Sequence, residues 1–153
     1  MILNIADERE MERLGAAFSA RLKSPALLFL RGDLGMGKTT FARGFIQSRG
    51  HKGSVKSPTY ALVEPYELEG ELLYHFDLYR LCDPEELELM GIRDYLADST
   101  VLVEWPERGE RLLPQPDLQL FFDSDSTTSE GLRLVRVEGE ERLLREVSEE
   151  MQQ

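Results

Sequence analysis

The sequence predicts an α/β fold, a three-layer sandwich with a mostly parallel central sheet and added antiparallel hairpin strands. Two observations support this prediction. A glycine-rich loop at residues 32–39 follows a short apolar run at 26–30 and precedes a segment of helical periodicity, which gives the order strand, loop, helix. Further short apolar runs at 72–76 and 101–103 have the length and composition of buried strands. Strands that alternate with helices in this way favour a parallel sheet covered by helices.

The N-terminal part of the chain predicts a strand followed by a helix. The apolar residues at 2, 3 and 5 suit a short first strand. Asp7 occupies the place of a helix N-cap, with Glu10 three residues later as in a capping box. Apolar side chains then recur at helical spacing and predict a face that packs on the sheet: Met11, Leu14, Phe18 and Leu22. Ser24-Pro25 ends this helix before the next strand.

Residues 32–39, Gly-Asp-Leu-Gly-Met-Gly-Lys-Thr, match the pattern G-x-x-x-x-G-K-[ST] of a phosphate-binding P-loop. Glycines allow the backbone N–H groups of such a loop to surround an anion, and the helix that starts here, running to about Ser48, adds its positive end. Lys38 is expected to reach the β- and γ-phosphates, and the hydroxyl of Thr39 to bind Mg²⁺. The fold is therefore predicted to be P-loop NTPase-like. The candidate nucleotide contacts are Gly32, Leu34, Gly35, Met36, Gly37, Lys38, Thr39 and Thr40.

The segment at 51–59 lacks periodicity and is long for a loop inside a compact domain. It lies where many P-loop proteins place a switch segment that responds to the nucleotide. Either Ser57 or Thr59 has a hydroxyl to offer to the γ-phosphate or to Mg²⁺. A plain surface loop is the alternative interpretation.

The remaining elements are predicted from apolar spacing and from turn residues. Strands at 60–68 and 72–76 form a hairpin. Asp83, as N-cap, and Pro84 begin a helix that stops at Gly91. A helical turn, a buried strand, two further strands and a closing amphipathic helix follow, in order, at 92–96, 101–103, 118–122, 132–137 and about 143–151. All of them are expected to form a single domain, residues 1–153.

Two acids, Asp77 and Glu104, directly follow apolar strands. In a doubly wound sheet the carboxyl ends of the strands line the ligand crevice, and a P-loop needs an acid there to hold Mg²⁺ directly or through water. Either acid can serve, and each can equally be a helix cap or a surface acid. Trp105 is expected at the rim of the site, stacked on a base, a ribose or a partner, unless it belongs to the core. His75 lies inside a strand and is assigned a structural role.

Composition narrows the class of protein. The formal net charge of −11 disfavours independent binding to nucleic acid, although residues 31–56 carry six Lys or Arg and one acid, as suits a phosphate site. Cys82 is the only cysteine, so no internal disulfide can form and no oxidising compartment is indicated. No apolar run approaches the roughly 18 residues of a membrane span, and residues 1–7 lack the pattern of a signal peptide. We therefore expect a cytoplasmic protein that does not enter a membrane.

The P-loop and five further blocks resemble the bacterial TsaE (YjeE) family. The blocks occur in the order and at the spacing of that family, densely over residues 31–109 and loosely at the ends. They are Ser-Pro-Thr-Tyr at 57–60, His-Phe-Asp-Leu-Tyr-Arg at 75–80, Asp-Pro-Glu-Glu-Leu at 83–87, Gly-Ile-Arg-Asp-Tyr at 91–95 and Glu-Trp-Pro-Glu-Arg-Gly at 104–109. Together they are far more specific than the P-loop alone. Met36 departs from the pattern, which commonly has a small residue there.

The resemblance implies a Mg²⁺-dependent ATPase that is needed for threonylcarbamoyladenosine modification of the adenosine next to the anticodon, in tRNAs that read codons beginning with A. It implies binding to the TsaB–TsaD heterodimer, hydrolysis of ATP to sustain turnover, and contact with tRNA only through that complex. The roles that it implies are metal ligand for Thr39 and Glu104, catalysis for Asp77 and Lys38, switch segment for residues 57–60, and a place near the nucleotide for Trp105. Glu8 near the base and Arg133 against the nucleotide are further candidates in the loosely matching parts.

Two other functions share the P-loop. A small-molecule kinase would need an acceptor pocket and usually a lid with arginines, but no basic lid segment occurs after residue 93. A non-catalytic interaction module would bind the nucleotide without turnover. For the ATPase we expect slow hydrolysis by the isolated chain, because no arginine has the sequence context of a finger that stabilises charge on the γ-phosphate.

Overall fold

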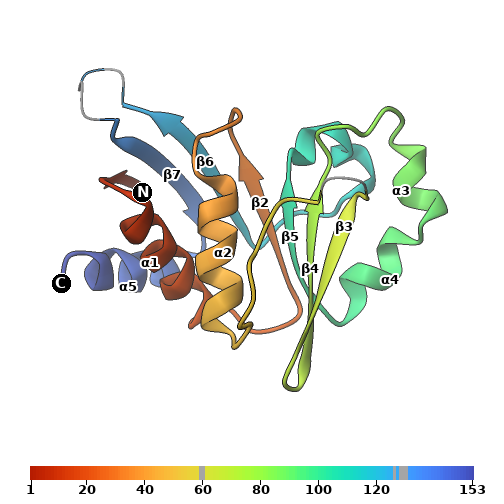
Figure 1. Cartoon of the computed structure of the whole chain (residues 1–153), viewed down its shortest axis with the longest axis horizontal. Helices are drawn as coiled ribbons and strands as arrows, with labels where there is room; N and C mark the ends of the chain where they lie inside the picture. Colours follow the sequence, from red (N-terminus) through yellow and green to blue (C-terminus); the bar gives the residue numbers. More distant parts are fainter. Residues whose placement is uncertain (59–60, 126, 128–130) are drawn as a thin grey trace.

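The computed structural model describes residues 1–58, 61–125, 127 and 131–153. Seven strands in this part of the chain form one sheet in the order β1-β7-β6-β2-β5-β4-β3 (Figure 1). Their bounds are β1 (Ile2–Ile5), β2 (Ala26–Arg31), β3 (Val63–Leu68), β4 (Glu71–Asp77), β5 (Thr100–Glu104), β6 (Leu118–Ser124) and β7 (Arg133–Gly139). The central strands β6, β2, β5 and β4 are parallel, whereas β7 pairs antiparallel with β6 and β1, and β3 with β4. The predicted α/β sheet with antiparallel additions is confirmed.

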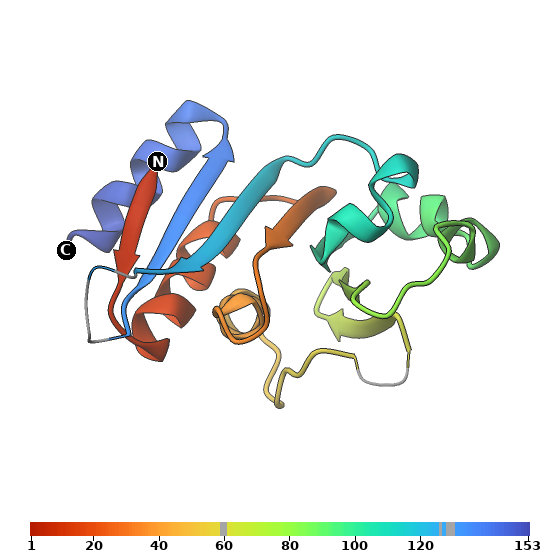
Figure 2. The same ribbon diagram turned by 90° about the horizontal axis from the view of Figure 1, so that it is seen from above.

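Helices lie on both faces of this sheet (Figures 1 and 2). They are α1 (Glu8–Ser19), α2 (Lys38–Ser48), α3 (Glu85–Leu89), α4 (Ile92–Ala97) and α5 (Glu141–Met151), with 3-10 turns at Pro106–Arg108 and Glu110–Leu112. One apolar core joins the sheet to α1, α2 and α5, and a second joins it to α3 and α4. Strand β2 serves both cores, because Leu28 and Leu30 belong to the first and Leu27 and Phe29 to the second. This alternation explains why its sequence is apolar throughout.

Helices α1 and α2 touch through their backbones. A Cβ atom at Gly15 would lie 2.3 Å from the carbonyl oxygen of Phe41, and one at Gly44 would lie 2.1 Å from that of Glu12. Only glycine fits at either position, so the two helices pack closer than side chains would allow. The start of α1 is fixed as well, because Asp7 accepts a hydrogen bond from the N–H of Glu10 at 2.8 Å.

The parallel register brings three strand ends together at the edge of the sheet where the P-loop begins. Glu104 at the end of β5 lies opposite Leu30 of β2 on one side and opposite Asp77 of β4 on the other. The two acids that were predicted to face the loop therefore lie on neighbouring strands, directly beside it.

Some element boundaries differ from the predictions. The hairpin strand predicted at 60–68 begins at Val63, and Thr59 and Tyr60 lie outside the described residues. The second strand begins at Glu71 because the turn needs only two residues, with Gly70 at φ 74°. Helix α3 has Pro84 rather than Asp83 at its N-cap, although the Asp83 carboxylate still accepts the N–H of Glu85 at 2.9 Å.

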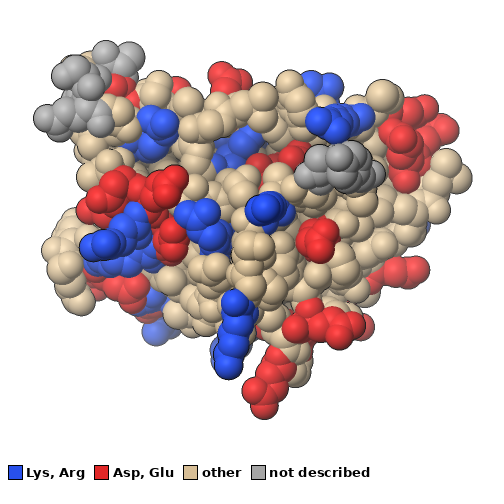
Figure 3. Space-filling model, viewed as in Figure 1, with Lys and Arg blue, Asp and Glu red and all other residues tan. Residues whose placement is uncertain are grey.

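Charge is distributed unevenly over the surface. On the face seen in Figure 3, Lys and Arg lie over and beside α2, while Asp and Glu lie over α1, over α3 and at the turn between β3 and β4. Within the described residues, no helix combines the length and the apolar character that crossing a bilayer requires.

Candidate nucleotide-binding site

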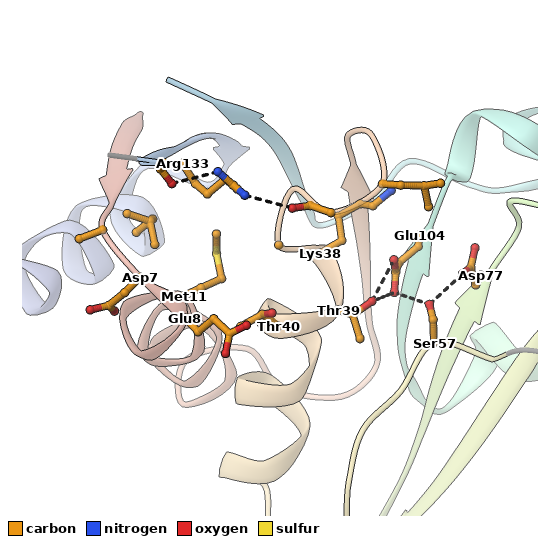
Figure 4. A pocket seen from close by; sticks show the side chains of 16 residues that line it. Asp7, Glu8, Met11, Lys38, Thr39, Thr40, Ser57, Asp77, Glu104 and Arg133 are labelled. Atoms are coloured by element: carbon orange, nitrogen blue, oxygen red, sulfur yellow. Dashed lines mark hydrogen bonds between the residues drawn. The ribbon is translucent and has the colours of Figure 1, made fainter. Parts of the chain in front are cut away.

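A pocket of about 460 Å³ opens beside the P-loop, at the carboxyl ends of the parallel strands (Figure 4). This volume lies in the range of small-molecule sites. The P-loop forms its floor, the β1–α1 junction and the start of β7 form one wall, and the ends of β4 and β5 form the other. The lining residues are Ile5, Ala6, Asp7, Glu8, Met11, Leu34, Gly35, Gly37, Lys38, Thr39, Thr40, Ser57, Asp77, Glu104, Gly131 and Arg133.

The P-loop backbone has the shape of an anion cradle. Gly35 and Gly37 adopt φ angles of 79° and 110°, in the left-handed region that side chains disfavour. A Cβ at Gly35 would meet no atom within 4 Å, so the backbone angle alone favours glycine there. Helix α2 starts directly at Lys38, and no side chain caps its first N–H groups. These donors need an acceptor, which phosphate oxygens in the pocket would provide.

Lys38 is held against the loop and is only 4% exposed. Its ammonium group donates a hydrogen bond to the carbonyl of Gly32 and lies 4.0 Å from the ring centroid of Trp105. Burial lowers the pKa of Lys38, and nearby carboxylates oppose this effect. Those carboxylates are Glu104, Asp77, Glu107 and Asp33. Lys38 is thus a cation surrounded by acids at the phosphate end of the pocket.

The acids meet the P-loop through a cluster of hydrogen bonds. Glu104 is 3% exposed, and its Oε2 accepts the Thr39 hydroxyl at 3.2 Å and the Ser57 hydroxyl at 3.0 Å (Figure 4). Ser57 also lies 2.8 Å from Oδ2 of Asp77. Ser57 therefore lies between the two carboxylates. A hydroxyl has a single hydrogen, so Ser57 can donate to only one of them at a time.

The oxygen atoms of Thr39 and Glu104 are suitable ligands for a Mg²⁺ ion. Burial by itself raises the pKa of Glu104, but hydrogen bonds from His75 and Ser57 and the charge of Lys38 hold this pKa below its usual value. The Thr39 hydroxyl and an ionised Glu104 are the hard oxygen ligands that Mg²⁺ prefers. In the part of the chain that the structure describes, no group of three His, Cys, Asp or Glu side chains is arranged to hold a metal ion.

The structure places most of the candidate residues around this pocket. Glu8 and Arg133 lie on the wall opposite Asp77, and Arg133 donates to the carbonyl of Gly35 at 3.3 Å (Figure 4). Met36 packs against the core instead of lining the pocket. Thr59 lies outside the described residues.

Trp105 contacts Lys38 of the P-loop and does not line the pocket. Its backbone has a left-handed φ of 58°, which turns the chain sharply after Glu104. The ring packs on Tyr79, with 5.0 Å between the centroids, and on Lys38. Its observed contacts are therefore with Lys38, with Tyr79 and with the second apolar core.

Sequence reasoning assigned His75 a structural role, and the structure places it outside the pocket lining but in contact with Glu104. Its Nε2 lies 2.7 Å from Oε2 of Glu104, and the ring is completely buried. One signal was available in the sequence. Alternate residues of a strand point to the same face, so His75 had to share the face of Asp77 two residues later.

Comparisons with known proteins identify the family of this chain. The family described as "Threonylcarbamoyl adenosine biosynthesis protein TsaE" matches residues 5–132. The tRNA threonylcarbamoyladenosine biosynthesis protein TsaE of Haemophilus influenzae is 52% identical over 125 residues, which cover 78% of this chain and 79% of the relative. The protein of the same name from Bacillus subtilis is 41% identical over 122 residues, 78% of this chain and 73% of the relative.

A solved structure shares the fold. The crystal structure of Bacillus subtilis YdiB superposes with a TM-score of 0.77 at 26% identity, over 99% of this chain and 93% of that one. The similarity therefore extends over the whole sandwich, including the strands that carry Asp77 and Glu104.

Proposed function

The chain belongs to the TsaE family of threonylcarbamoyladenosine biosynthesis proteins, and from this premise we propose that it is a Mg²⁺-dependent ATPase. In this proposal it binds a TsaB–TsaD heterodimer and hydrolyses ATP so that the heterodimer can continue to modify tRNA. The modified base is the adenosine next to the anticodon in tRNAs that read codons beginning with A. The protein acts in the cytoplasm and meets tRNA only through the complex.

One observation carries the assignment of nucleotide chemistry. The Thr39 hydroxyl, from the P-loop, lies 3.2 Å from Glu104, which ends a strand 65 residues later. A P-loop that only formed a turn into a helix would not need a buried carboxylate beside its hydroxyl. The contact joins the two groups that P-loop enzymes use to hold Mg²⁺.

In this proposal each group of the pocket has its own role. The first N–H groups of α2 and Lys38 bind phosphate oxygens, while Thr39 and Glu104 hold the metal. Bound Mg²⁺ would neutralise charge on the phosphates. Asp77 is fixed from two sides, because its Oδ1 accepts the N–H of Tyr79 at 3.0 Å and its Oδ2 accepts the Ser57 hydroxyl. A carboxylate held in this way can orient a water molecule for attack on the γ-phosphate.

The distribution of charge supports dependence on a partner. Arg133 is the only arginine that lines the pocket in the described residues, and it lies across the pocket from Asp77. Its guanidinium donates to the carbonyls of Gly131 and Gly35. The phosphate end has Lys38 as its cation among four nearby carboxylates. Fast hydrolysis needs further positive charge at the γ-phosphate, and a partner can supply it.

Incubation of ATP with the protein, alone and with TsaB and TsaD, tests the proposal. We expect slow release of free phosphate from the isolated protein and a large increase with both partners. A phosphorylated small-molecule acceptor would instead identify a kinase. Binding of ATP without either product, in all mixtures, would identify a non-catalytic interaction module. The partner requirement is wrong if the isolated protein already matches the rate of the mixture.

A further inference from the structure

His75 is a buried polar side chain with a single hydrogen bond. It lies on β4 between Leu73 and Asp77, and these alternate residues face the same side of the sheet, toward α2. The imidazole has no exposed surface. Its Nε2 contacts Oε2 of Glu104 at 2.7 Å, and its Nδ1 has no hydrogen-bond partner among the described residues.

The direction of this hydrogen bond follows from the chemistry of the two groups. An ionised carboxylate can only accept, so Nε2 carries the hydrogen. Burial of a polar ring is costly unless its groups are paired, and an aliphatic side chain would fill the same space at lower cost. The bond to Glu104 is therefore the polar interaction that His75 provides at this position.

Three donors meet at Oε2 of Glu104, and the two hydroxyls among them are less firmly held than His75. The Ser57 hydroxyl is shared with Asp77, and the Thr39 hydroxyl is itself a proposed metal ligand. Both hydroxyls can rotate away when the nucleotide binds. The imidazole cannot, because the ring is enclosed on all sides. Oε1 of Glu104 has a single neighbour in the cluster, the Thr39 hydroxyl at 3.5 Å, which leaves this oxygen available.

We propose that His75 is a positioning residue, whose Nε2–H holds Oε2 of Glu104 so that Oε1 is presented to the metal. This inference rests on the proposed function, because it requires that Glu104 hold Mg²⁺. Groups that orient a metal ligand in this way typically contribute about 10- to 100-fold to metal affinity.

Calorimetric titration of ADP into the purified protein tests this role. ADP affinity is measured in EDTA and over a series of Mg²⁺ concentrations, for the wild type and for H75L, H75Q and H75N. Leucine removes the donor and keeps the volume. Glutamine places an N–H₂ group at about the reach of Nε2, whereas asparagine is one methylene shorter. Leu73→Ala, on the same face of β4 and also fully buried, serves as the control for loss of stability alone.

We expect H75L and H75N to raise the half-saturating Mg²⁺ concentration about tenfold or more, with ADP affinity in EDTA unchanged. H75Q should restore most of the Mg²⁺ response, and Leu73→Ala should leave it unchanged. If H75L does not fold, the difference between H75Q and H75N decides. An unchanged Mg²⁺ response in the histidine variants, equal loss in H75Q and H75N, or equal loss with Leu73→Ala overturns the role of His75 alone. A wild type that binds ADP without any response to Mg²⁺ overturns the metal site as well.

Discussion

The pocket has two parts that are built in opposite ways. The floor consists of eight consecutive residues, 32–39, whose backbone is shaped by three glycines with positive φ, Gly32, Gly35 and Gly37. The acid wall combines the side chains of Ser57, Asp77 and Glu104, which come from a loop and two strands. His75 is buried outside the pocket lining and contacts Glu104. The floor is thus specified locally, and the acid wall exists only once β4 and β5 have paired.

This difference indicates how the two parts should respond to substitution. In the proposed function, loss of Asp77 or of Glu104 removes a group with one defined role, in hydrolysis or in metal binding. In the same proposal the floor binds phosphates through several N–H groups, so single changes there should weaken binding by smaller factors. Substitutions at five residues of the pocket test the comparison, from the largest expected effect to the smallest.

Asp77→Ala should reduce phosphate release hundreds-fold or more while Mg²⁺–nucleotide binding remains, because the group that orients water is lost. Rates in the presence of TsaB and TsaD, together with nucleotide titrations, measure the two effects separately. Asp77→Asn keeps the shape and loses the charge, and should be almost as slow.

Glu104→Ala should show the opposite pattern, with Mg²⁺-dependent binding lost first. If Asp77→Ala loses Mg²⁺–nucleotide and Glu104→Ala retains it, the two roles are exchanged.

Lys38→Ala should weaken nucleotide binding by about 10- to 100-fold, both with Mg²⁺ and in EDTA, because it removes a charged hydrogen bond to the phosphates. Equilibrium titration in the two buffers checks this. Lys52→Ala, an exposed lysine of the same basic segment, should leave binding unchanged. Equal weakening by both variants would mean that general charge, and not the P-loop contact, attracts the nucleotide.

Thr39→Ala should weaken nucleotide binding by roughly tenfold, and only when Mg²⁺ is present, since the hydroxyl is a proposed ligand of the metal. The same titrations detect it. Thr39→Ser retains the hydroxyl and should bind as the wild type does. An equal loss with Mg²⁺ and with EDTA contradicts the assignment of Thr39 as a metal ligand.

Gly35→Ala should have the smallest effect, because the new Cβ meets no neighbour and adds only backbone strain at φ 79°. That strain costs about 1 kcal/mol, or roughly fivefold in nucleotide affinity. Gly50→Ala is the matched control, with φ 108° and equally open surroundings at the end of α2. The control should lose similar stability on thermal unfolding without a change in nucleotide affinity. Equal losses of affinity would show that strain acts through global stability.

Local patterns allowed much of the fold and half of the site to be predicted. The P-loop, the Asp7 cap and the alternation of apolar runs depend on neighbours in sequence, and the structure has them where they were expected. The two acids were predictable as a pair because parallel strands end at the same edge of the sheet. The turn at Trp105 was not predictable, because no local sequence pattern indicates a tryptophan with a left-handed backbone conformation.

His75 shows why the other half was not predictable. Its partner Glu104 is 29 residues away, and the hydrogen bond depends on the register between β4 and β5. A single histidine in an apolar strand has the same local pattern whether it only fills the core or contacts a carboxylate. Its contact with Glu104 became visible only with the neighbouring strand in place.

The backbone contact between α1 and α2 determines which parts of the pocket can move independently. Gly15 and Gly44 bring the two helices into contact without intervening side chains, so neither helix can slide or rotate without a collision. Helix α1 carries Glu8 and Met11 of one wall, and α2 begins at the P-loop floor. These two parts are therefore joined in one closely packed unit. We expect any change in the shape of the pocket to occur on the opposite side, at Ser57.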